Sequence, residues 1–154
     1  MSQQVQEFNH FRLATIKDLK YLAPRLRFED KREILSTAGM FPYTALYYSY
    51  LKSAIVFTIV NDKKEPVGIF GVAVSGAIWL LATDKLKEIQ FAFLKENKKV
   101  IDFLNTKYKI LWNYVDSRNS LHIKWLKWCG FKFINKKKYG VLNEPFYEVI
   151  KICA

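Results

Sequence analysis

Hydrophobic residues recur at helical spacing over most of the first fifty-four positions of the chain. A short segment before them, FRLAT (11–15), alternates apolar and polar residues and is predicted to form a strand. Three helices are predicted to follow, over 16–26, 28–39 and 43–54. Thr15 is a favourable N-cap for the first helix, and Pro24 is expected to perturb its end.

The second of these helices, FEDKREILSTAG, has a charged side and an apolar side. We expect Ile34 and Leu35 to face the interior and the charged run at 31–33 to face solvent. Gly39 suits the left-handed position that often ends a helix. The segment is therefore predicted to be an amphipathic helix that stops at this glycine.

From residue 54 onward the pattern changes to dense runs of β-branched and apolar residues. Strands are predicted over 54–60, 67–74, 77–83, 110–115, 131–135 and 146–152, and helical spacing returns over 84–108 and 121–130. The turns between the first three of these strands are short, which predicts an antiparallel meander. Because a helix connects 77–83 with 110–115, these two strands are predicted to run parallel.

Composition limits the class of protein. The chain has 154 residues, of which 51% are hydrophobic, so we expect one domain over 1–154 with a buried core, and residues 1–9 to be flexible. No run of 18 apolar residues is present, so a membrane-spanning helix is not expected. The polar N-terminal segment lacks the features of a secretory signal.

The charge balance is strongly basic. Lys and Arg number 25 against 14 Asp and Glu, a formal net charge of +11 that attracts polyanions such as nucleic acid or phosphorylated cofactors. The basic residues are mostly lysines, which argues against sequence-specific DNA recognition. The densest run, at 136–138, is interpreted as the solvated loop tip of a hairpin.

Cysteine and histidine are scarce. Cys129 and Cys153 are too few for a disulfide framework or a cysteine-based zinc site, and are interpreted as reduced residues of a cytosolic chain. His10 and His122 lie far apart in the sequence, and no HExxH pattern occurs. A metal site is therefore not expected.

The most informative segment is ILWNYVDSRNSLHIKWLKWCGFKF (110–133), which is predicted to form a strand, a turn, a helix and a second strand. Asn119 can cap the helix, Gly130 permits a left-handed turn at its end, and Phe131 can fill the core. These roles are structural. For Asn119, capping and contact with a cofactor both remain open.

This segment and the order of the elements resemble the GNAT superfamily of N-acetyltransferases. There, an Asn after the fifth strand is followed eleven residues later by a Gly-Phe pair, as Asn119 is by Gly130 and Phe131 here. LRFEDKREIL, EPVGIFGVAVSGAIWLLATD and FLKENKKVIDFLN, together with this segment, also resemble a family of small proteins of short-tailed bacteriophages. Members of that family are described as internal virion (core) proteins or GNAT-like acetyltransferases.

The resemblance implies an α/β protein with the GNAT fold. This fold has a six- to seven-stranded mixed, mostly antiparallel sheet, with splayed parallel central strands and helices on both faces. In the superfamily, acetyl-CoA lies in the gap between those two strands, and its pantetheine arm pairs with backbone of the fourth strand. The matching positions here are Leu80, Leu81 and Ala82. A backbone amide at this place would polarise the thioester carbonyl.

The chain departs from the superfamily after the fourth strand. GNAT enzymes have a glycine-rich loop there that holds the pyrophosphate at a helix N-terminus. The corresponding segment, ATDKLKEIQFAFLKENKK, contains no glycine. Lysines could hold the phosphates instead, either Lys85 and Lys87 or Lys98 and Lys99, or these side chains could simply lie on a solvated helix face.

The sequence also offers candidates for the acid and the base of the reaction. The position where many GNAT enzymes have a tyrosine is Leu126, so Tyr114 and His122 are the candidate acids, and Glu29 is the candidate base. Each has a structural alternative: a packed aromatic ring, a hydrogen-bonded core histidine, and an acid that complements the start of a helix.

Three functions therefore compete. The first is an acetyl-CoA-dependent N-acetyltransferase acting on a protein or small amine acceptor. The second is a catalytically inactive GNAT-fold virion or assembly protein that contacts other phage proteins. The third is a basic nucleic-acid-binding module. The resemblance implies the host cytoplasm or the virion as location, and no membrane partner is expected.

Overall fold

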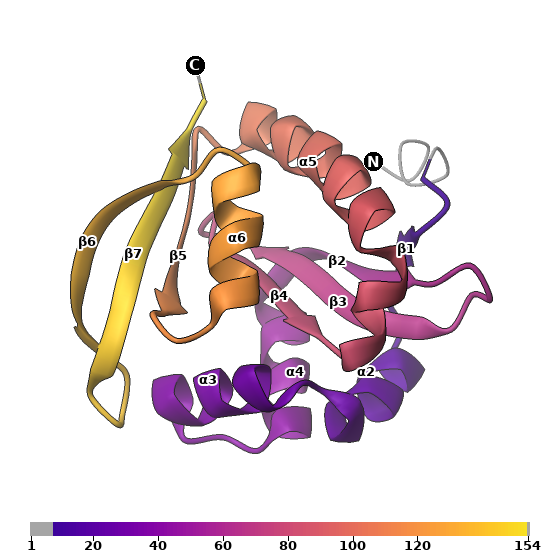
Figure 1. Ribbon diagram of the computed structural model, residues 1–154, viewed down its shortest axis with the longest axis horizontal. Coiled ribbons are helices and arrows are strands. Elements are labelled where there is room, and N and C mark those ends of the chain that lie inside the picture. The colour runs from indigo at the N-terminus through magenta and orange to yellow at the C-terminus, as the bar shows by residue number, and fades with distance from the viewer. Residues whose placement is uncertain (1–7, 154) are drawn as a thin grey trace.

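The computed structural model of the chain describes residues 8–153 and is shown in Figure 1. One sheet has the order β1-β2-β3-β4, and a second has the order β5-β7-β6; all their pairings are antiparallel. The strands are β1 Phe11–Leu13, β2 Ser53–Val60, β3 Pro66–Ala73, β4 Ile78–Ala82, β5 Ile110–Asp116, β6 Lys132–Tyr139 and β7 Glu144–Ile152. The helices are α2 Ile16–Leu22, α3 Phe28–Ala38, α4 Pro42–Lys52, α5 Gln90–Lys107 and α6 Ser120–Trp128, with 3-10 turns η1 Ala23–Arg25 and η2 Asp84–Ile89.

The two sheets meet where β4 lies beside β5. Ala77 and Trp112 form a single parallel bridge, and the backbone amide of Trp112 donates to the carbonyl of Gly76 at 3.2 Å. The side chain of Asn113 donates to the carbonyl of Ile78. Within the described residues, no ladder joins β4 to β5 beyond this bridge. The predicted parallel, splayed pair is therefore confirmed, and the gap divides the seven strands of the described residues into two sheets.

Helices cover both faces of the β1–β4 sheet, as Figure 1 shows, with α5 and α6 on one side and α2, α3 and α4 on the other. Successive residues of a strand point to opposite faces. Accordingly, Ile78, Leu80 and Ala82 pack in the core that includes α5 and α6, whereas Trp79 and Leu81 pack against the core of the other helical layer. β4 thus contributes to both cores, and its free edge borders the gap.

Helix α3 turns a different face inward from the one that the sequence predicted. Asp30, Ile34 and Ser36 are buried, Leu35 is exposed, and Glu33 is largely covered. The expected inward Leu35 and outward Glu33 were therefore wrong. The helix ends as predicted at Gly39, which has φ +65°. Ile34 packs in an apolar cluster as expected, but Asp30 and Glu33 meet the polar start of α6, so charged residues share the inward face.

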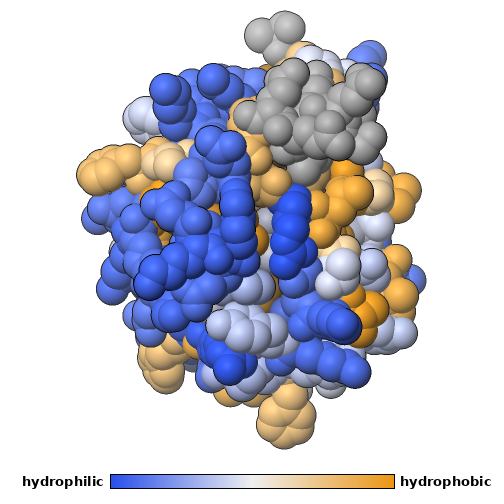
Figure 2. Space-filling view, turned by 90° about the vertical axis from the view of Figure 1, so that its right-hand side faces the viewer, coloured by the Kyte–Doolittle hydropathy of each residue, from blue (hydrophilic) through white to orange (hydrophobic). Residues whose placement is uncertain are grey.

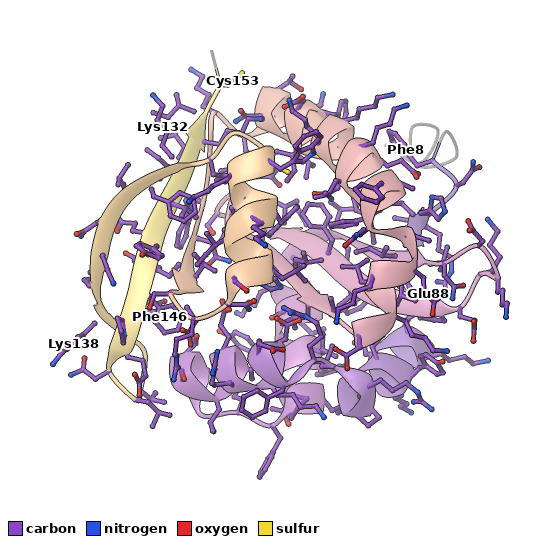
Figure 3. All side chains as sticks on the ribbon, viewed as in Figure 1. Phe8, Glu88, Lys132, Lys138, Phe146 and Cys153 are labelled. Carbon is purple, nitrogen blue, oxygen red and sulfur yellow. The ribbon has the colours of Figure 1, made fainter. Side chains whose placement is uncertain are left out.

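The lysine run 136–138 was also misplaced by the prediction. These residues are exposed but lie within β6, paired with residues 145–147 of β7, and Lys132 and Lys138 project along the outer strand in Figure 3. The turn comes later, where Gly140 and Asn143 adopt positive φ. The run is a solvated strand edge instead of a loop tip.

Two further expectations concern the N-terminal segment and the absence of a membrane-spanning helix. Residues 1–7 of the segment expected to be flexible lie outside the described residues; within it, Phe8 packs against the core and its ring lies 6.3 Å from that of Phe11. Among residues 8–153, no helix has the length and apolar character needed to cross a membrane.

Substitutions at Gly140 and Gly39 test how closely the β6–β7 turn packs against the end of α3. A Cβ on Gly140 would lie 2.8 Å from the Cα of Thr37 and overlap the carbonyl oxygen of Ser36, whereas one on Gly39 would lie 3.5 Å from the nearest atom, of Val141. Both glycines have positive φ, which costs an alanine about 1–2 kcal/mol. We expect Gly140→Ala to lower the free energy of unfolding by at least about 1 kcal/mol more than Gly39→Ala, because only the former also clashes. Urea unfolding of both variants measures this; equal losses would contradict it.

Candidate functional site

The edge of β4 that faces the gap is occupied by the chain itself at one position. Backbone groups of alternate residues point to the same side of a strand, and Ile78, Leu80 and Ala82 point away from β3. The amide of Ala82 donates to Oδ2 of Asp30 at 2.8 Å, and its carbonyl accepts from the amide of Arg27 at 2.8 Å. The neighbouring Leu26 and Thr83 form an antiparallel bridge. The start of α3 therefore pairs with the end of β4 much as another strand would.

Asn119 is the centre of a buried polar cluster beside this contact. Its Oδ1 accepts from Nη2 of Arg27 at 3.0 Å, and its Nδ2 donates to Oδ1 of Asp30 at 3.0 Å and to Oε2 of Glu33 at 2.7 Å. Asp30 also accepts from Nη2 of Arg27 at 2.9 Å. Asn119 stands at the N-cap position of α6, but its side chain does not cap that helix. Its amide instead ties α6 to α3, so the predicted capping role was wrong.

His122 and Glu33 lie at the margin of this cluster. Nε2 of His122 is 3.1 Å from Oδ1 of Asp30 but not in hydrogen-bond geometry. Burial lowers the pKa of His122, with the charge of Arg27 adding to that effect and Asp30 opposing it. Burial raises the pKa of Glu33 to about 8, helped by the charges of Asp30 and Asp116 and opposed by the hydrogen bond from Asn119. At neutral pH, His122 is therefore uncharged and the Glu33 carboxyl is mostly protonated.

Two cavities approach each other at the gap. The first, of about 270 Å³, lies between the splayed strands and helices α3 and α4, and Glu33, His122 and Tyr114 are among its lining residues. The second, of about 150 Å³, lies between η2, the start of α5, and α6. Leu80 and Trp125 line both cavities. The backbone of Leu80 is thus the part of β4 that faces the gap where the two spaces meet.

The second cavity combines apolar walls with positive charge. Arg27, Lys87 and Lys124 line it together with leucine and aromatic side chains, and no carboxylate does. In the segment that follows β4, however, the amide of Lys85 is not available to a ligand, because it donates to Oγ1 of Thr83 at 3.2 Å. Asp84 places a negative charge in the same turn. This turn does not offer an anion a free set of backbone amides.

The predicted cofactor-binding residues are dispersed. Leu80 lines both cavities and Leu81 lines the first, whereas Ala82 lines neither and is bonded to α3. Lys98 and Lys99 are exposed on α5, outside both cavities.

The two other lysines considered from the sequence differ from each other. Lys87 lines the second cavity, whereas Nζ of Lys85 lies 3.6 Å from Oε2 of Glu65. Of the four lysines, Lys87 alone therefore lines a cavity that a phosphate could approach.

The predicted catalytic residues are only partly together. His122 and Tyr114 line the first cavity, but the Tyr114 hydroxyl donates to Glu148 at 2.8 Å, and its ring stacks on Tyr139 with centroids 4.1 Å apart. Glu29 lies outside both cavities, with Oε2 at 3.6 Å from Nη1 of Arg27.

Glu33 was missed as a candidate. Its sequence signal is its place on the inward face of α3, three residues after Asp30 and next to Ile34, and that face becomes visible only once the helix is oriented.

The order of the strands and helices, with β4 and β5 splayed apart, is that of the GNAT fold. Its structure is similar to spermidine N-acetyltransferase from Vibrio cholerae in complex with CoA and spermine, with TM-score 0.67, 13% identity, and 93% of this chain and 94% of that chain covered. The aminoglycoside acetyltransferase AAC(6')-Ib in complex with ribostamycin and coenzyme A gives TM-score 0.69, 14% identity and coverage of 93% and 92%. The ribosomal-protein-S5-alanine acetyltransferase from Vibrio fischeri gives TM-score 0.60, 16% identity and coverage of 95% and 94%.

Sequence comparison adds the family. The model of the family described as "Bacteriophage T7, probable scaffold protein Gp13" matches residues 57–138, more than half of the chain. The chain belongs to this family. No curated protein sequence matches it. The expected GNAT fold is confirmed, and the expected relation to bacteriophage proteins is confirmed at the level of this family.

The raised pKa of Glu33 predicts how stability changes with pH. Between the ordinary value of 4.5 and about 8, the folded chain keeps this proton while the unfolded chain loses it. The free energy of unfolding should therefore fall as pH rises across this window, by up to about 1.4 kcal/mol per pH unit. Glu33→Gln, which mimics the protonated acid, should remove this component.

The measurement is urea unfolding at several pH values for the wild type, Glu33→Gln and the control Glu29→Gln. Glu29 is the neighbouring acid outside both cavities, so its variant should keep the wild-type pH dependence. An unchanged slope in Glu33→Gln would contradict the assignment.

Proposed function

We propose that this chain is a catalytically inactive assembly protein of a bacteriophage particle, built on the GNAT fold. The observation that carries the proposal is the pairing of Ala82 with Arg27 and Asp30. In the superfamily that the sequence resembles, backbone at this end of the fourth strand pairs with the pantetheine arm. Here both backbone groups of Ala82 already have partners within the chain, so an arm would have to displace a buried carboxylate to reach them.

The surroundings of Ala82 also fit acetyl-CoA poorly. The turn after β4 uses the Thr83 hydroxyl to bind the amide of Lys85, and Asp84 would repel a pyrophosphate there. Lys87 and Lys124 would attract phosphate, but exposed lysines on a chain with net charge +11 do so without specificity. Of the β4 residues whose backbone faces the gap, Ile78 is bonded to Asn113 and Ala82 to the start of α3, which leaves Leu80. These contacts argue against the usual acetyl-CoA site.

The family description supports the proposed role in assembly. Its members are grouped under a probable scaffold protein, and a scaffold acts through contacts with other proteins of the particle. The proposed partners are therefore other phage virion proteins, and the proposed location is the particle or its precursor in the host cytoplasm.

Titration with acetyl-CoA tests the inactive half of the proposal. We expect no rise in melting temperature of the full chain up to millimolar acetyl-CoA, because a ligand stabilises a protein only by binding its folded state. The spermidine N-acetyltransferase from Vibrio cholerae is a suitable positive control, since its structure was determined with CoA. A rise of several degrees, matched by heat of binding in calorimetry, would refute the proposal.

Complementation tests the inactive half in a second way, without acetyl-CoA. In a phage whose copy of this gene is disrupted, Glu33→Gln and His122→Gln should restore particle yield to within about twofold of the wild type, because neither change removes a surface contact. Circular dichroism of the purified variants controls for folding. A loss of infectious particles of about a hundredfold with folded variants would show that the ionisable groups of the first cavity are needed, and would contradict the proposed lack of catalytic activity.

A second function is favoured by one observation. Glu33, with a pKa of about 8, and neutral His122 line the same cavity, which is the arrangement that general acid–base chemistry requires. If acetyl-CoA binds, these residues, with Tyr114, become the candidates for an N-acetyltransferase that acts on an amine, and the acetyl-CoA titration decides between the two functions.

A further inference from the structure

Strand β6 has one edge that no other strand covers. It is the outer strand of the β5-β7-β6 sheet, it pairs only with β7, and Figure 1 shows it at one side of the molecule. In the described part of the chain, no strand or isolated bridge occupies its other edge. An open strand edge presents a row of backbone donors and acceptors, so it can pair with a further strand.

The register shows which backbone groups of β6 point away from the sheet. The amide of Ser117 donates to the carbonyl of Pro145 at 3.1 Å, so the backbone of Pro145 faces β5. Backbone groups of alternate residues point to the same side of a strand, so Tyr147 also faces β5. Lys138 and Lys136 lie opposite these two residues in β6. Their amides and carbonyls therefore do not bond to β7 and are offered at the free edge.

The free edge is also lined by positive charge. Lys132, Lys136, Lys137 and Lys138 are exposed on β6, which contains no Asp or Glu. Within residues 8–153, Lys137 is the one member of this set that forms an ion pair, with its Nζ 3.9 Å from Oε2 of Glu148. The other three charges are therefore available to a partner.

Positive charge alone does not single out this edge. The net charge is +11, and hydrophilic side chains also cover a broad part of the opposite side of the molecule, which Figure 2 shows. The outer strand of the other sheet, β1, has only 3 residues, whereas β6 has 8. The distinguishing feature of β6 is that its lysines accompany a long row of unpaired backbone groups.

The two faces of β6 differ in character. Lys136 and Lys138 share one face, because successive side chains of a strand alternate between faces. Lys137 and Tyr139 share the other, where the partly buried ring of Tyr139 stacks on Tyr114 with centroids 4.1 Å apart. A strand added at this edge would place its own side chains alternately on the two faces. Acidic side chains suit the first face, and apolar side chains suit the second, next to Tyr139.

An acidic peptide fits this edge better than a second copy or a nucleic acid. A second copy would set its own lysines against these, and like charges oppose such pairing. A nucleic acid has phosphates that lysines attract, but it has no strand backbone to pair with the outward amides and carbonyls. An extended acidic segment satisfies both, since opposite charges across paired strands attract.

We propose that the free edge of β6 binds an extended acidic segment of another protein of the particle, which adds a strand to the β5-β7-β6 sheet. Its backbone pairs with that of Lys136 and Lys138, and its carboxylates lie beside their side chains. The proposal rests on the assembly role for the source of the segment, but it does not depend on whether acetyl-CoA binds.

Fluorescence anisotropy with a model peptide tests the role of charge. The probe is a fluorescein-labelled peptide of alternating glutamate and valine, about as long as β6. We expect saturable binding to the full chain at micromolar concentrations, weakened by added salt. The double variant Lys136→Gln/Lys138→Gln should raise the dissociation constant about fivefold or more. The control, Lys17→Gln/Lys20→Gln, removes the same charge from exposed positions on α2 and should stay within about twofold of the wild type.

Amide hydrogen exchange tests the strand pairing. On peptide binding, exchange at the outward amides of Lys136 and Lys138 should slow at least about tenfold, because pairing removes them from water. The amide of Lys137, which already faces β7, should change less. A peptide with an N-methyl group on every backbone nitrogen keeps the charge but cannot donate, so it should bind at least about tenfold more weakly.

Three results would overturn the proposal. They are unchanged exchange at Lys136 and Lys138 in the complex, an N-methylated peptide that binds as tightly as the unmodified one, and equal binding by the two double variants. Tighter binding of an oligothymidylate of equal charge would identify a nucleic acid as the ligand and would overturn it as well. None of these measurements involves acetyl-CoA or particle yield, so this proposal and the proposed function can fail separately.

Discussion

Backbone groups at the end of β4 need partners, and the start of α3 supplies them. A strand edge beside a gap would leave a buried amide and carbonyl unsatisfied, which costs about 1–3 kcal/mol for each group. Arg27 and Asp30 satisfy both groups of Ala82, and Asn119 holds those two side chains from α6. This polar cluster therefore joins the start of α3, the end of β4 and the start of α6.

The same contact also bears on function, because it uses backbone groups of β4 beside the gap. Solved structures at 13–16% identity share the arrangement of strands and helices of this chain, in which β4 and β5 are splayed. A fold does not carry a reaction by itself, because the reaction depends on the groups placed in the site. Here the gap remains, but the backbone beside it and the turn after β4 are used internally. An assembly role is consistent with a retained scaffold and an occupied site.

Burial of so many ionisable groups is tolerable because their charges compensate. Arg27 and Asp30 form an ion pair with atoms 2.9 Å apart, and a buried pair is stable only when its remaining donors and acceptors are bonded. Asn119 provides those bonds. Glu33 and His122 avoid further charge, since burial moves the pKa of each toward its neutral form. The cluster is thus close to neutral at pH 7, which lowers the cost of burying it.

The sequence determined those features that depend on neighbouring residues. Gly39 and Gly130 were predictable as left-handed helix ends, and the crossover helix made β4 and β5 parallel, because backbone sterics and chain connectivity act locally. Tertiary structure decided the rest. The rotation of α3 brought Glu33 inward and left Leu35 exposed, and the cross-chain bonds of Asn119 could not be inferred from the Asn-to-Gly-Phe spacing. Helical periodicity shows that a helix has two sides, but only packing against α6 and β4 decides which polar residues lie on the buried one.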